Sequence, residues 1–242
     1  MVSRYPNMNL FLKFFFILPI AFCIFQFGAK SAPNVLFIAV DDLNDWVGFM
    51  GGYSGQVKTP NLDRLAKMGT AFTNAHTASP VCCPSRVAVL SGQLPTTSGI
   101  YSNRHWWKPN VPELVTIPAH FRNNGYKTVG AGKIFHHTEG NNPPESWDDF
   151  QALEFHDDTF ARTRRDQYPF IPDQDAPKGF PFSGIELYSN EVDWAGLDKP
   201  ESDFDDARAA QYGIDFLNSH RGSPFFLACG FFRPHMPWYF PK

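Results

Sequence analysis

Short apolar segments that alternate with amphipathic helical segments predict an α/β sandwich around a mostly parallel central sheet. Three segments have the composition of strands buried on both faces: 33–40, 126–131 and 224–232. Continuous apolar runs of this length are typical of central strands in parallel sheets, and the helical segments between them supply the outer layers. The length of 242 residues and the hydrophobic content of 43% are enough for a sizeable core.

The first thirty-two residues predict a secretory signal peptide, and therefore an exported protein. Arg4 and Lys13 precede an apolar run, residues 14–27, which small residues follow. The run contains Pro19 and is shorter than the roughly 20 residues that span a bilayer. No stable membrane insertion is therefore expected. A retained N-terminal anchor is the alternative.

The N-terminal half of the mature chain then predicts one strand and two helices around a loop. The strand at 33–40 ends at Asp41 and Asp42. A helix follows Thr59, the expected N-cap, and stops at Gly69. Residues 71–76 are expected to form another short strand. The polar loop 77–84 leads from there into a buried helix at 85–93.

The C-terminal half continues the alternation of helices and strands. A helix over 116–124, capped by Thr116, precedes the strand at 126–131. A second helix, 205–220, precedes the strand at 224–232. Between these pairs, residues 139–199 are rich in proline, aspartate and glycine without a sustained period, which predicts a long irregular insertion. The ending at 238–242 has no closing helix and suits a truncated domain.

Charge and cysteine content narrow the possible functions. The formal net charge is −3 without a basic run, so nucleic-acid binding is not expected. Beyond the leader the cysteines are Cys82, Cys83 and Cys229. An odd number in an exported protein argues against a disulfide framework and leaves at least one thiol to explain.

Polar residues follow three of the predicted strands, at the edge where α/β proteins bind ligands. Asp41 and Asp42 follow the first, Lys133 and His136 the second, and His235 the last. Paired carboxylates are costly unless a cation or a proton accompanies them, and their hard oxygens favour calcium or magnesium. Each residue alone has a simpler reading as a turn former, a helix cap or a solvated loop residue.

The most specific segment is Val81-Cys82-Cys83-Pro84-Ser85-Arg86, on a loop entering a helix. It contains Cys-x-Pro-Ser-Arg, which resembles the modification signature of the formylglycine-type sulfatases. The resemblance implies that Cys82 is oxidised to formylglycine, whose hydrate attacks sulfate-ester sulfur. A helix N-terminus favours an anion at such a place. Two buried structural cysteines before a helix are the alternative.

Other segments resemble the same family over nearly the whole mature chain. They are 34–43 (NVLFIAVDDL), 59–66 (TPNLDRLA), 91–95 (SGQLP), 125–136 (GYKTVGAGKIFH) and 223–235 (SPFFLACGFFRPH). The last two look most like the iduronate-2-sulfatase branch. The resemblance implies an alkaline-phosphatase-like sandwich with helices flanking the sheet, of which residues 33–242 would be the N-terminal part, the C-terminal part missing.

By this resemblance, Asp41, Asp42 and the modified Cys82 would bind one calcium ion. Arg86 would stabilise the modified side chain, Lys133 and His235 would hold sulfate oxygens, and His136 would assist turnover. The physical chemistry agrees, because fixed cations and a metal stabilise the negative charge that builds on a leaving sulfate. In the family, a further Asp with His or Asn and a further Lys complete the site from segments that this sequence does not contain.

The sequence thus predicts a sulfuric ester hydrolase acting on a sulfated sugar or polysaccharide, with a formylglycine-generating enzyme as maturation partner. Two alternatives stay open. One is an inactive or merely ligand-binding fragment of such an enzyme. The other is a metal-dependent phosphatase or phosphodiesterase of the same superfamily, although those enzymes use Ser or Thr at the nucleophile position.

Overall fold

The structure, a computed structural model, describes residues 32–136, 141–152, 194–236 and 238–242. The chain divides into two compact units, Met1–Pro33 and Asn34–Lys242, and every helix and strand named below belongs to the second. Among the described residues, no helix is both long and apolar enough to cross a membrane. The predicted signal peptide, 1–32, falls almost entirely outside the described ranges.

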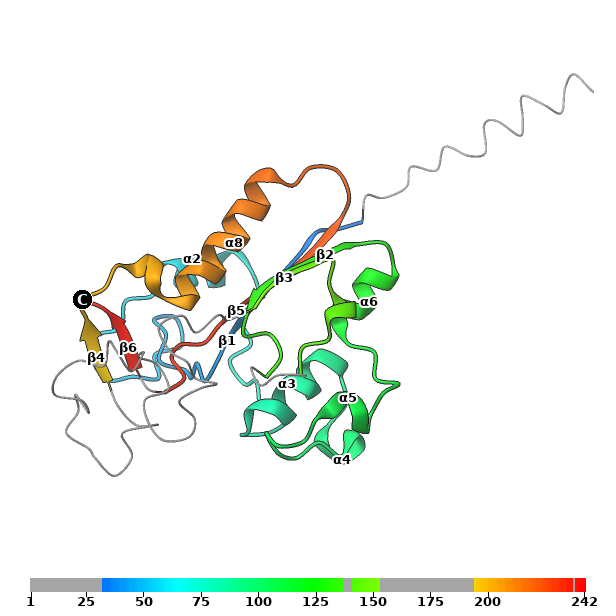
Figure 1. The fold of residues 1–242 in the computed structure, drawn as a ribbon. Coiled ribbons are helices and arrows are strands. Elements are labelled where there is room, and N and C mark those ends of the chain that lie inside the picture. Colours follow the sequence, from blue (N-terminus) through cyan, green and yellow to red (C-terminus); the bar gives the residue numbers. More distant parts are fainter. Residues whose placement is uncertain (1–31, 137–140, 153–193, 237) are drawn as a thin grey trace, which may run out of the picture. The chain divides into compact units, whose positions relative to one another are not determined.

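A four-stranded sheet forms the centre of the second unit (Figure 1). Its strands are, in spatial order, β1 (Val35–Val40), β5 (Phe225–Phe231), β2 (Lys127–Gly132) and β3 (Asp149–Gln151). All three pairings are parallel. The predicted α/β architecture with a parallel sheet is therefore confirmed, and the three predicted strands are β1, β2 and β5.

Of the three remaining strands that the structure describes, two lie within the predicted insertion. In 139–199, the described residues include β3, which joins the main sheet, and β4 (Trp194–Leu197). The latter pairs in parallel with β6 (Trp238–Pro241), so the chain's last described residues form a strand. The expected irregular structure does not hold for these parts, and residues 153–193 lie outside the described residues.

Helices connect the strands and cover both faces of the sheet. They are α2 (Pro60–Met68), α3 (Cys82–Ser91), α4 (Pro95–Ser98), α5 (Trp107–Asn110), α6 (Ile117–Asn123) and α8 (Asp205–Ser219), with 3₁₀ turns η1 (Pro144–Ser146) and η3 (Glu201–Asp203). One core cluster joins the α3 and α6 side to the sheet, with Phe226 and Ala228 pointing from β5. A second packs Tyr212 and Phe216 of α8 against Leu227 and its neighbours.

One predicted strand is absent, and one predicted helix begins earlier than expected. Residues 71–76 form no strand; all six are exposed, Phe72 to 79%, and a strand requires a neighbouring strand to accept its hydrogen bonds. The helix predicted at 85–93 begins three residues earlier, at Cys82. Its first turn tolerates Pro84, because the N–H that proline lacks has no intrahelical partner there.

The two threonines expected as helix caps precede their helices as predicted, but neither caps with its side chain. The Thr59 hydroxyl instead accepts the N–H of Gly48 at 2.8 Å and donates to Asp63 at 3.1 Å. It therefore ties the loop after β1 to α2. The apolar stripe of α2 is also not buried, since Leu62 and Leu65 are exposed.

A close backbone crossing of two glycines determines how β2 ends. Gly132 has a positive φ of 77°. The backbone N–H of the next residue, Lys133, donates to the carbonyl of Gly230 on β5 at 2.9 Å. A Cβ at residue 132 would overlap that carbonyl, and one at residue 230 would overlap the carbonyl of Lys133. The two strands can approach this closely only because both residues lack a side chain.

We predict that Gly132→Ala lowers the free energy of unfolding by about 3 kcal/mol or more, since overpacking adds to left-handed strain. Gly125→Ala is the matched control, because Gly125 has a φ of 81° but nothing within 4 Å of its added Cβ. It should cost only about 1–2 kcal/mol. Urea unfolding of both variants measures the difference, and equal losses would contradict the crossing.

Candidate active site

The ends of three parallel strands bring the predicted site residues to one edge of the sheet. In the strand register, Val40 lies beside Phe231, and Gly132 lies beside Gly230. The residues that follow, Asp41, Lys133 and Phe232, therefore emerge side by side. The N–H of Asp41 donates to the carbonyl of Phe231 at 3.0 Å, which continues the β1–β5 ladder to the site itself.

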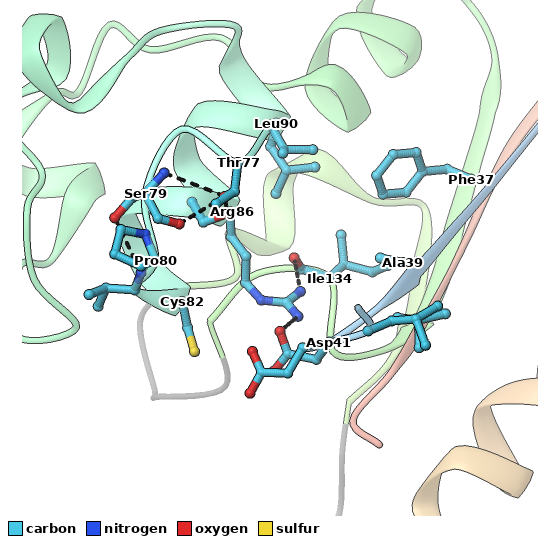
Figure 2. Close-up of a pocket in the computed structure, with 16 residues that line it drawn as sticks. Phe37, Ala39, Asp41, Thr77, Ser79, Pro80, Cys82, Arg86, Leu90 and Ile134 are labelled. Atoms are coloured by element: carbon cyan, nitrogen blue, oxygen red, sulfur yellow. Dashed lines mark hydrogen bonds and ion pairs between the residues drawn. The ribbon is translucent and has the colours of Figure 1, made fainter. Parts of the chain in front are cut away.

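The Asp41 carboxylate is shared by two cations. The Arg86 guanidinium contacts one of its oxygens and the Lys133 ammonium contacts the other (Figure 2 shows the Arg86 contact). Lys133 is only 1% exposed and Asp41 is also buried. Burial by itself raises the pKa of Asp41, but the charges of Lys133 and Arg86 outweigh it and hold that pKa below its usual value.

Arg86 also ties the helix of the site to the sheet. Its Nη1 donates to the carbonyl oxygens of Lys133 at 2.6 Å and Ile134 at 2.8 Å. The planar guanidinium thus bonds the end of β2 and the end of β1 together from α3. The position of α3 over the sheet edge is fixed by this one side chain as well as by apolar packing.

Cys82 is the first residue of α3 and faces the Asp41 side of the site (Figure 2). One ligand atom from each of Asp41, Cys82 and His235 lies within 4.8 Å of the others. Burial, reinforced by Asp41 and Asp42 and opposed by Lys133 and Arg86, raises the pKa of the Cys82 thiol. An unmodified Cys82 is therefore a protonated thiol at neutral pH and a poor nucleophile.

The neighbouring Cys83 has a structural environment. It is buried, and burial raises the pKa of its thiol to about 11. Its backbone N–H donates to Asn103 at 2.8 Å, so a distant side chain caps the first turn of α3. This N–H is consequently not available to an anion.

His235 lies on the other side of the site, after β5. Its Nε2 is 3.9 Å from an oxygen of Asp42, and its ring packs on Phe232 with centroids 4.6 Å apart. The same Phe232 ring lies 4.0 Å from the Lys133 ammonium. Burial, followed by the Lys133 charge, lowers the pKa of His235.

His136 is 6% exposed, and its environment disfavours a proton on the ring. Burial, with Lys133 and Arg86 adding to it, lowers the pKa of His136 to about 4. The imidazole is therefore neutral at pH 7.

A cavity of about 560 Å³ opens over this arrangement (Figure 2). Asp41, Asp42, Cys82 and Arg86 line it, together with Thr77 and Ser79 of the preceding loop. The cavity is large enough for a small ligand, and its charged lining residues are Arg86, Asp41 and Asp42. The other three residues singled out from the sequence lie next to it: Lys133 contacts Asp41, His235 lies near Asp42, and the charges of Lys133 and Arg86 act on His136.

Two contributors were not singled out from the sequence. Asn103 caps the first turn of α3 from a loop, and Phe232 contacts both Lys133 and His235. No local pattern links Asn103 to Cys83. Phe232 is one of several phenylalanines in the predicted apolar strand 224–232. In the sequence, its position three residues before His235 was the only sign that it lies near the site.

Comparison with known proteins adds independent information. A family model described as Sulfatase matches residues 33–242. A Formosa agariphila protein named Sulfatase is 34% identical over 225 residues, 87% of this chain and 40% of that protein. Iduronate 2-sulfatase of Homo sapiens is 35% identical over 226 residues, 89% of this chain and 37% of that enzyme. The chain thus spans about 40% of the length of these relatives.

Solved structures share the fold at lower identity. Phosphonate monoester hydrolase of Agrobacterium radiobacter superposes with a TM-score of 0.60 and 20% identity, covering 87% of this chain and 43% of that one. A protein in complex with its substrate D-glucosamine-2-N,6-O-disulfate superposes with a TM-score of 0.57 and 18% identity, covering 86% and 36%. These alkaline-phosphatase-like neighbours confirm the predicted fold class.

We predict a strong energetic coupling between Asp41 and Lys133. Asp41→Asn leaves two buried cations without their carboxylate and should lower the free energy of unfolding by about 3–5 kcal/mol. Lys133→Met should cost less, because Arg86 still balances Asp41. In a double-mutant cycle by urea unfolding, the coupling should exceed about 1 kcal/mol.

The largely exposed pair Lys108–Glu145 provides the control for this cycle. Its coupling should stay within about 0–1 kcal/mol, because solvent screens exposed pairs. Similar couplings in the two pairs would mean that burial adds nothing to the Asp41 contact.

We further predict that His136 contributes to acid sensitivity. The imidazole takes up its proton near pH 6.5 in the unfolded chain but only near pH 4 in the folded protein. Protons therefore bind preferentially to the unfolded chain, and stability falls as the pH drops from about 6.5 to 4, by about 3 kcal/mol in all. His136→Gln should flatten this part of the profile in denaturant unfolding, whereas His120→Gln, at an exposed position, should leave it unchanged.

Proposed function

Since the chain belongs to the sulfatase family over residues 33–242, we propose that it is part of a sulfuric ester hydrolase that removes sulfate from a sugar or polysaccharide. The supporting observation is the position of Cys82. It begins α3, lines the cavity, and faces a carboxylate that two buried cations flank. The residue types and their convergence suit transfer of a sulfuryl group.

Cys82 is proposed to become formylglycine through a formylglycine-generating maturation enzyme. The raised pKa of the thiol supports this, because an unmodified Cys82 would be a weak nucleophile at neutral pH. The hydrated aldehyde offers a hydroxyl at the same position in the first turn of α3. Cys83, which is buried and bonded within the core, stays a thiol in this proposal.

The cations around residue 82 are proposed to bind the sulfate group. Lys133 and His235 would hold its oxygens, and Arg86 would stabilise the charge on the modified side chain. Their convergence on Asp41 supports this arrangement, since preorganised donors in a half-buried site stabilise developing charge more than donors in water. His136, neutral at pH 7, would accept the proton during turnover.

The donor set also fits one calcium ion. Asp41 and Asp42 supply carboxylate oxygens beside residue 82, and conversion of Cys82 replaces a sulfur donor by an oxygen donor. Calcium prefers such hard oxygen ligands. When bound, the ion would act as a Lewis acid toward a sulfate oxygen.

The proposed substrate is a sulfated carbohydrate, and the branch is that of the iduronate-2-sulfatases. The 35% identity to iduronate 2-sulfatase over 89% of this chain supports this branch. Export through residues 1–32 is part of the proposal, since sulfated polysaccharides lie outside the cytoplasm.

We predict that co-expression with a formylglycine-generating enzyme converts Cys82 and leaves Cys83 unchanged. The tryptic peptide 68–86 contains both residues, so mass spectrometry should show one hydrazide-reactive aldehyde and one alkylatable thiol. Cys82→Ala should abolish the aldehyde and Cys83→Ala should preserve it. A peptide that carries two thiols would refute the proposed nucleophile.

The modified protein should also hydrolyse an aryl sulfate in preference to the matching aryl phosphate. Calcium removal by a chelator should reduce this activity, and added calcium should restore it. A preference for the phosphate would instead favour a phosphatase of the same fold.

A further inference from the structure

A carboxylate outside the cavity anchors the loop that carries His235. Asp206, in the first turn of α8, accepts the backbone N–H of Phe232 at 2.6 Å and that of Arg233 at 2.8 Å, one on each oxygen. The two donors are consecutive residues just after β5. One side chain therefore fixes two successive peptide planes at the point where the chain leaves the sheet.

The peptide groups of Phe232 and Arg233 begin the turn that carries His235. Arg233 precedes a cis proline, Pro234, and the N–H of His235 donates back to the carbonyl of Phe232 at 3.0 Å. The turn from Phe232 to His235 is thus closed on itself and attached to α8 through Asp206. Moving the attachment moves the whole turn.

The Phe232 side chain contacts two of the site residues, Lys133 and His235. It is 3% exposed, its ring lies 4.0 Å from the Lys133 ammonium, and it packs on the His235 ring at 4.6 Å. A cation that is in contact with an aromatic face and a carboxylate has little freedom to shift. The ring therefore aligns Lys133 and His235 with each other.

Asp206 is partly buried and lies in the first turn of α8 next to a second acid, Asp205. Burial raises its pKa, while the two N–H bonds and the Arg233 charge oppose that rise. The adjacent Asp205 shows the ordinary role of an acid in a first helical turn, since it pairs with Arg208 on the same helix. Asp206 instead points across to the loop after β5.

We propose that Asp206 is a positioning residue for the sulfate-binding side of the site. It acts through the Phe232–Arg233 backbone to hold Phe232 against Lys133 and His235. The catalytic part of this inference depends on the function proposed above, whereas the anchoring does not. The Asp205–Asp206 pair resembles an ordinary acidic first turn of a helix, so the sequence contains no sign of this role.

The test compares Asp206→Ala and Asp206→Asn with the matched control Asp205→Asn. The control changes one charge in the same helical turn and breaks the contact with Arg208, while Asp206 keeps both of its hydrogen bonds to the loop. Asp206→Asn guards against misfolding of the alanine variant, because its amide oxygen can still accept one of the two N–H groups.

The first measurement is independent of activity. The Phe232 ring should shift the Lys133 side-chain protons in the NMR spectrum of lysine-labelled protein. This shift should be lost in Asp206→Ala, reduced in Asp206→Asn and retained in Asp205→Asn. Amide exchange at Phe232 and Arg233 should accelerate in the same order. Unchanged shift and exchange in both Asp206 variants would overturn the anchoring.

The second measurement is kinetic, on the formylglycine-bearing protein with an aryl sulfate, well below the unfolding midpoint of each variant. Asp206→Ala should lower kcat/KM about 10- to 100-fold, Asp206→Asn less, and Asp205→Asn no more than about twofold. Equal rates despite a lost Lys133 shift would overturn the positioning role. If the unsubstituted protein hydrolyses no sulfate ester, the proposed function fails while the NMR measurement still decides the anchoring.

Discussion

The site depends on a single buried carboxylate that two cations share, Lys133 fully buried and Arg86 largely so. Asp41 receives Arg86 on one oxygen and Lys133 on the other, and these two residues arrive from α3 and from the end of β2. Burying any one of the three alone would be strongly unfavourable, because a desolvated charge without a partner costs several kcal/mol. Their contacts join α3 to the ends of β1 and β2, next to Cys82.

Burial and the charges of this cluster explain the protonation states around it. Lys133 and Arg86 add to desolvation in keeping His136 neutral, and Asp41 opposes them. Lys133 likewise adds to desolvation in lowering the pKa of His235, against the opposing charges of Asp42 and Asp41. The Cys82 thiol resists ionisation because burial and the two aspartates outweigh the cations.

Backbone geometry at the sheet edge makes the cluster possible. Gly132 and Gly230 let β2 and β5 approach so closely that Lys133 turns inward directly after β2. On the far side of Lys133, Phe232 occupies the space that water would otherwise fill, and Asp206 holds the backbone of that residue. The polar and apolar parts of the site thus depend on the same two strand ends.

Much of this was accessible from the sequence. Continuous apolar runs identified β1, β2 and β5, and the polar residues after them identified Asp41, Lys133 and His235, because parallel strands end at one edge of a sheet. The motif at Cys82–Arg86 predicted the residue that the proposal makes the nucleophile, and the structure places it in the lining of the cavity. The strand expected at 71–76 failed, since a local pattern cannot provide the neighbouring strand that hydrogen bonding requires. The sequence therefore predicted the side chains to which the proposal assigns the chemistry. The contacts of Asn103, Phe232 and Asp206 around them became visible only in the folded chain, because they join segments far apart in the sequence and leave no periodic or local signal.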